Sequence, residues 1–169
     1  MAQRWRVPVT IGIYVLLLAG LVLPHLGIIG HGMGRSLIPA GMLFSQVQIA
    51  AIGAEFDAGL LGLGINIGYL GIGLHQLGML LAVASVWVLA TEDINRWIYR
   101  IAVVGGWLLT ASAPIAALGW MLIRTSGAPG LLGLAWLPAL IAGLGIIIVA
   151  WRSRERIDRS WYVTKPELQ

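Results

Sequence analysis

The stretch that most constrains the fold runs from residue 58 to residue 90. Its thirty-three residues contain seven glycines, one histidine (His75) and no formally charged side chain. About 20 apolar residues in a helix cross the ~30 Å hydrocarbon core of a bilayer, so this stretch is long enough to hold a transmembrane helix. We expect that helix to cover about residues 67–90. The chain is therefore predicted to be an integral membrane protein.

Composition agrees with that prediction. The 169-residue chain is 59% hydrophobic and 11% charged, whereas soluble domains are about a quarter charged. Three further apolar stretches predict spans at about residues 7–30, 101–123 and 131–151. We expect the first to be retained, because no signal-peptide cleavage pattern follows it, and to be kinked at Pro24. The predicted fold class is an all-α bundle of four transmembrane helices, forming one membrane domain over residues 1–169.

The region between the first two predicted spans, residues 31–66, is expected on the outer side. Residues 36–54 lack charge and could form a fifth span, but Gln46 and Gln48 suit a lipid-facing helix poorly. We expect an amphipathic or re-entrant segment there, with five spans as the alternative. Gln46 and Gln48 could also face a quinone headgroup.

The basic residues predict an orientation. With four spans and a cytoplasmic N-terminus, nine basic residues lie inside and two, Arg35 and Arg124, lie outside, as the positive-inside rule favours. We therefore expect both termini on the cytoplasmic side of a prokaryotic cytoplasmic membrane. The basic tail, residues 152–169, can meet anionic lipid there, and topology accounts for the net charge of +4 without nucleic acid.

The central stretch also carries the sharpest candidate site. At steps of four and three residues, one helix face collects small residues around His75. An imidazole nitrogen can bind haem iron, or the magnesium of a chlorophyll, and missing side chains let a flat macrocycle lie against the helix. Gly71 and Gly78 are the expected cradle, and His75 would be a metal ligand only through the macrocycle. The face comprises Gly64, Gly68, Gly71, His75, Gly78, Ala82 and Ser85.

His25 and His31 are also candidate ligands of the macrocycle. His31 has Gly27 and Gly34 at the same offsets that Gly71 and Gly78 have from His75, which would form a second lane if its segment were helical. His25 instead matches His75 in depth, since the two lie roughly 27 and 22 Å from the inner ends of their predicted helices. Only His75 belongs to both arrangements.

The same glycines have a plainer interpretation. Small residues in membrane helices let two backbones approach closely, and Gly64 with Gly68 forms a GxxxG pair. On this interpretation the face is a helix-packing seam, and His75 forms a hydrogen bond across it.

Other polar residues suggest a different class of function. Glu55, Asp57 and Asn66 could line a polar route, which would make the protein a small transporter or channel. At a bend facing water the two carboxylates are also explained as caps, and Asn66 as an interhelical hydrogen bond. The chain has no cysteine and no side-chain arrangement typical of a hydrolase or transferase.

The sequence as a whole predicts a small non-catalytic subunit of a larger energy-transducing membrane complex, respiratory or photosynthetic. It would pack against other subunits through glycine-rich faces and hold a haem or chlorophyll-type macrocycle at His75. In architecture alone, four short spans with histidines on the first two resemble the haem-bearing membrane anchors of respiratory enzymes. A likeness of that kind assigns no function by itself.

Overall fold

The computed structural model describes residues 5–30, 33–39, 59–90, 96–127, 130–132 and 134–163. Three helices in these ranges are long and apolar enough to cross a membrane, which is compatible with a membrane helical bundle. They are α3 (Leu60–Ser85), extended by the short 3-10 helix η1 (Val86–Leu89), α4 (Arg96–Thr125) and α5 (Trp136–Val163). A shorter apolar helix, α1 (Arg6–Val22), packs beside them.

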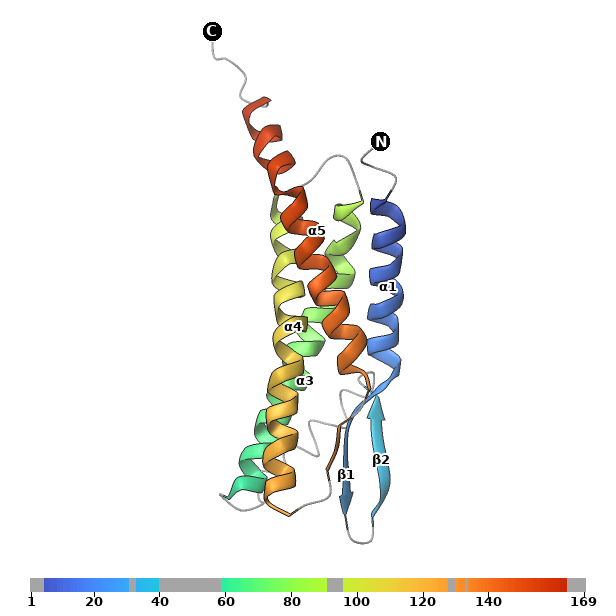
Figure 1. The fold of residues 1–169 in the computed structure, drawn as a ribbon, viewed down its shortest axis with the longest axis vertical. Coiled ribbons are helices and arrows are strands. Elements are labelled where there is room, and N and C mark those ends of the chain that lie inside the picture. Colours follow the sequence, from blue (N-terminus) through green and yellow to red (C-terminus); the bar gives the residue numbers. More distant parts are fainter. Residues whose placement is uncertain are drawn as a thin grey trace.

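Helices α3 and α4 lie side by side and antiparallel, and α5 and α1 complete the bundle at one end of that pair (Figure 1). A small antiparallel sheet in the order β2-β1-β3 continues from the ends of α1 and α5 that face away from Arg6. Its strands are β1 (Pro24–Gly30), β2 (Met33–Pro39) and β3 (Gly130–Leu132). α1 and α5 therefore lie beside one half of the α3–α4 pair, whereas the other half of that pair lies at the level of the sheet.

The first helix is shorter than the expected span over residues 7–30. It ends at Val22, and Leu23 adopts an extended backbone with φ −72° and ψ 151°. The cause is Pro24, whose ring disfavours the helical conformation of the residue before it. The expected kink at Pro24 is thus wrong, because the proline ends the helix and begins β1. His25 lies on that strand.

The glycine lane expected around His31 is also wrong. Gly27 lies on β1 and Gly34 on β2, and these strands pair antiparallel from Pro24↔Pro39 to Gly30↔Met33. On paired strands, the minus-four and plus-three offsets no longer define one helix face. His31 itself lies outside the described residues, as do Gln46, Gln48, Glu55 and Asp57.

The remaining boundaries also differ from the predicted ones. Helix α3 begins at Leu60 rather than near residue 67, so part of the expected outer segment belongs to it. Helix α4 extends beyond its predicted span at both ends. Helix α5 starts later than expected, after β3, and continues to Val163 through much of the expected basic tail.

Candidate functional site

The small-residue face of α3 packs directly against the backbone of α4. A methyl group added at Gly71 would lie 2.9 Å from the amide nitrogen of Ala116, and one at Gly78 would lie 2.9 Å from that of Leu109. At Gly64 it would lie 2.8 Å from the nitrogen of Ile123. Real β-carbons do not approach other atoms so closely, so glycine is required at all three positions.

Helix α4 supplies matching glycines. A methyl group on Gly119 would meet the nitrogen of Gly68 at 2.5 Å, and one on Gly105 would meet that of Ala82 at 2.9 Å. Contacts therefore run antiparallel along the whole face, from Gly64 at one end to Ala82 at the other. This is the close approach that small residues permit between membrane helices, so the face acts as a packing seam between α3 and α4.

A second glycine contact joins α4 to α5. A methyl group on Gly143 would lie 2.7 Å from the carbonyl oxygen of Gly106 and 2.7 Å from the hydroxyl of Thr110. Both successive helix pairs, α3 with α4 and α4 with α5, are thus held at backbone contact distance by glycines. Close backbone packing at these positions thus joins α3, α4 and α5.

His75 is fully buried where α1, α3 and α5 meet. Its imidazole lies edge-on to the ring of Trp136, with 5.3 Å between centroids and 75° between planes. On the α1 side, a methyl group added at Gly20 would lie 3.7 Å from His75 Cε1 and 3.6 Å from the β-carbon of Ala139. A backbone group of Gly20 also faces the imidazole. Neighbouring helices therefore enclose the ring.

The expected macrocycle does not fit this arrangement. Over Gly71 and Gly78 it would occupy the space held by the backbone of α4, and beside the imidazole it would meet Trp136 and Gly20. Binding at His75 would require α4 or α5 to move away. Among the described residues, no group of three His, Cys, Asp or Glu side chains could hold a metal ion.

Three buried serine hydroxyls bond within their own helices. Ser85 donates to the carbonyl of Leu81, Ser112 to that of Leu109 and Ser153 to that of Val149. Hydroxyls satisfied by the preceding helical turn do not form a connected chain of polar groups. Within the described helices, these serines thus give no polar route along the bundle.

Asn66, a candidate for such a route, does not face the interior. It is exposed on α3, on the side away from the seam. An interhelical hydrogen bond within the bundle is therefore not its role either.

Sequence reasoning assigned Arg6 only to orientation, yet its side chain is almost fully buried between α1 and α5. One of its terminal nitrogens donates a hydrogen bond to the Ser153 hydroxyl at 3.4 Å, and its guanidinium lies 5.8 Å from the ring centre of Trp5. Thr10, one turn further along α1, is buried on the same face. The only sequence signal was Arg6 and Thr10 at a spacing of four, which is too common to be diagnostic.

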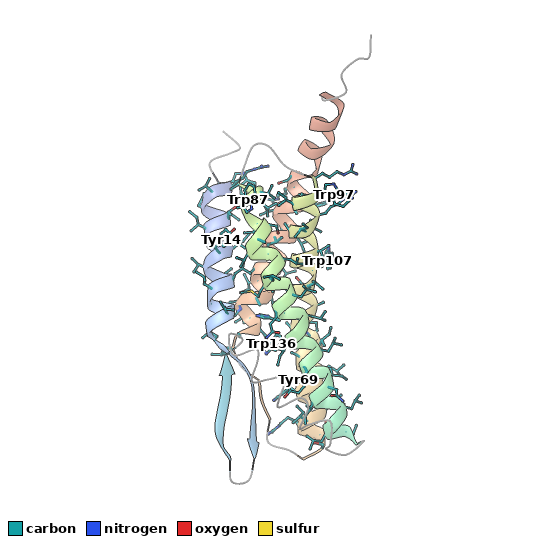
Figure 2. The ribbon with its side chains drawn as sticks, turned by 180° about the vertical axis from the view of Figure 1, so that it is seen from behind. Tyr14, Tyr69, Trp87, Trp97, Trp107 and Trp136 are labelled. Atoms are coloured by element: carbon teal, nitrogen blue, oxygen red, sulfur yellow. The ribbon has the colours of Figure 1, made fainter. Side chains whose placement is uncertain are left out.

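The tryptophans differ in their surroundings. Trp136 lies towards the sheet end of the bundle beside His75, whereas Trp87 and Trp97 lie near the opposite end (Figure 2). The guanidinium of Arg100 lies 5.2 Å from the ring centre of Trp97, and both side chains are exposed. An arginine over an exposed tryptophan is typical of the headgroup level of a membrane.

Comparison of the chain with protein-family models, with curated proteins and with solved structures gave no match.

Proposed function

We propose that this protein is a small non-catalytic subunit of a larger membrane assembly, in which its helices serve as a packing element. The observation that carries the proposal is the closed seam between α3 and α4. Gly71 and Gly78, which could have cradled a cofactor, instead bring α3 and α4 to backbone contact. A chain that uses its most distinctive residues in this way is suited to building a scaffold.

The interior of the bundle supports the same proposal. Among the described residues, the buried polar side chains are one histidine, enclosed by Trp136 and the Gly20 backbone, one arginine and a few hydroxyls. The hydroxyls of Ser85, Ser112 and Ser153 are bonded to their own helices. A catalytic site needs a nucleophile or base placed beside an open binding position, and the described interior offers no such pair.

The orientation and lipid partners belong to the proposal as well. Arg96, Arg100 and Arg152 are exposed at the end of the bundle where α1 begins, and Trp97 and Trp151 are exposed beside them. Basic residues favour the cytoplasmic side, and exposed arginines with tryptophans suit anionic headgroups. We therefore assign this end to the cytoplasmic face. An electron-transfer assembly remains a prediction that depends on a macrocycle at His75.

Extraction of the native protein in a mild detergent, followed by determination of the chains that accompany it, tests the proposal. A subunit elutes with other membrane proteins at fixed stoichiometry, and the ratio survives a second purification step. Recovery of this chain without any other protein, over several detergents, would contradict the proposal.

The transporter alternative depends on Glu55, Asp57 and Asn66, of which Asn66 is exposed on α3 and the two carboxylates lie outside the described residues. Flux assays on the purified chain in liposomes distinguish it directly. Solute or ion flux that depends on Asn66 would favour transport over the subunit function.

A further inference from the structure

The side of α3 opposite the packing seam has its own regular pattern. Nine of the exposed residues recur at alternating steps of four and three, the spacing that keeps one face towards a neighbouring helix in a left-handed pair, and Leu60 and Val83 are exposed beside them. The pattern extends over the whole helix and into η1. These residues are Gly59, Leu63, Asn66, Leu70, Gly73, Leu77, Leu80, Ala84 and Trp87.

This face differs from the exposed face of α5. Between Leu137 and Ile148 of α5 the exposed residues are all bulky and apolar, as a lipid-facing surface requires: Leu137, Ile141, Leu144 and Ile148. On α3, by contrast, a carboxamide (Asn66) and a bare glycine (Gly73) interrupt the leucines. A methyl group added at Gly73 would meet nothing within 4 Å, so no contact within the chain explains this glycine. A helix-interior glycine costs about 1 kcal/mol relative to alanine, a cost that the exposed Gly12 of α1 shares; Gly73 differs from Gly12 because it lies seven residues from Asn66 on one face.

Leucines occupy one of the two positions in a seven-residue repeat along this face. Leu63, Leu70 and Leu77 repeat every seven residues and are about half exposed, at 51%, 56% and 48%. Asn66 and Gly73 occupy the other position of the same repeat. Leucine at one core position with a single asparagine at the other is the arrangement that specifies register in two-stranded parallel coiled coils.

We propose that this face of α3, from Gly59 to Leu77, binds the same face of a second copy of the chain in a parallel, two-fold symmetric dimer. Copies inserted in one orientation place Asn66 of each chain at the same depth. A carboxamide both donates and accepts hydrogen bonds, so Asn66 is its own complement across a two-fold axis. A second copy necessarily presents a carboxamide at the membrane depth of Asn66, whereas a different protein need not do so.

The glycines determine which part of the helix makes contact. Gly59 and Gly73 lack side chains and lie on either side of Asn66 at seven-residue spacing, so two backbones can approach closely there. Leu80 and Trp87 stand at the equivalent positions towards the other end, and these larger side chains separate the helices. The two α3 helices therefore meet at the sheet end and diverge towards η1. This dimer is independent of the proposed subunit function.

Because the chain has no cysteine, single-cysteine variants report the interface without background. Oxidation in native membranes is expected to cross-link Asn66→Cys and Gly73→Cys into dimers and to leave Trp87→Cys largely monomeric. The matched controls are Leu137→Cys and Leu144→Cys on α5, which are similarly exposed and expected to stay monomeric. Equal cross-linking on α3 and α5, or none at Asn66 and Gly73, would overturn the proposal.

Energy transfer between labelled copies in liposomes supplies the second test. Asn66→Leu is expected to weaken dimerisation roughly three- to tenfold, as the loss of one interhelical hydrogen bond predicts. Gly73→Ile is expected to abolish close approach, because it places a branched side chain on the axis. Gly12→Ile is its control, since Gly12 is an exposed glycine on α1 with nothing within 4 Å of an added methyl group. An unchanged dimer in Gly73→Ile, or equal loss in Gly12→Ile, would contradict the assignment.

Discussion

The seam between α3 and α4 makes a quantitative prediction for Gly119→Ala. The added β-carbon would lie 2.5 Å from the amide nitrogen of Gly68 and 2.8 Å from the carbonyl oxygen of Gly64. Both obstacles are backbone atoms, so no side-chain rotation can relieve the clash. Restoring an ordinary contact of about 3.4 Å requires the helices to separate by about 0.9 Å, the difference between 3.4 and 2.5 Å.

That separation weakens close packing over the neighbouring turns. Overpacking of a well-filled interior typically costs about 1–3 kcal/mol, and the helix propensity gained by alanine offsets at most about 1 kcal/mol. Gly119→Ala is therefore expected to lower the free energy of unfolding by about 1–2 kcal/mol. Gly12→Ala is the matched control, because an added methyl group there meets nothing within 4 Å and only the propensity gain remains.

Reversible unfolding in mixed micelles with increasing denaturing detergent, followed by tryptophan fluorescence and circular dichroism, measures both variants. The predicted order of stability is Gly12→Ala, then wild type, then Gly119→Ala. A Gly119→Ala protein as stable as the wild type would refute the reasoning, since the two helices could not then lie at the described distance.

Three further predictions concern single side chains. Trp136→Ala is expected to cost about 3–5 kcal/mol of unfolding free energy, because Trp136 is 5% exposed beside His75, whereas Trp151→Ala, at 73% exposed, should change it by less than about 0.5 kcal/mol in the same assay. Tyr14→Phe removes a 3.0 Å hydrogen bond from its hydroxyl to the carbonyl of Val83 and is expected to cost about 1 kcal/mol; equal stability would show that α1 does not dock on α3 as described. Arg6→Leu is expected to weaken the contact between α1 and α5, seen as faster proteolysis near the start of α1, and unchanged cleavage would contradict the buried position of Arg6.

The central helix and its small-residue face could be predicted because length, lack of charge and regular spacing are properties of one segment. What occupies the face could not be decided from that segment, since a macrocycle and a second helix both require missing side chains. A signal did exist elsewhere: Gly105 and Gly119 are fourteen residues apart, as are Gly64 and Gly78. Two lanes of equal length on successive antiparallel helices favour helix packing.

The first helix shows where sequence reasoning failed. Pro24 was interpreted as a tolerated kink because the apolar character continues to Gly30, but hydrophobicity does not distinguish a helix from a buried strand over so few residues. Leu23 is extended and Pro24 begins β1, so the depth comparison between His25 and His75 no longer applies. The enclosure of His75 by Trp136 and Gly20 was equally inaccessible, because it depends on how α1 and α5 cross α3.

Because α4 fills the glycine face of α3, we expect no macrocycle at His75. The most direct measurement is the visible absorption spectrum of the gently purified native protein, oxidised and reduced, together with the spectrum of His75→Leu. We predict no haem or chlorophyll-type band at one pigment per chain, and identical spectra for both proteins. A stoichiometric band that disappears in His75→Leu would contradict this prediction and would mean that α4 or α5 leaves the imidazole in the native assembly.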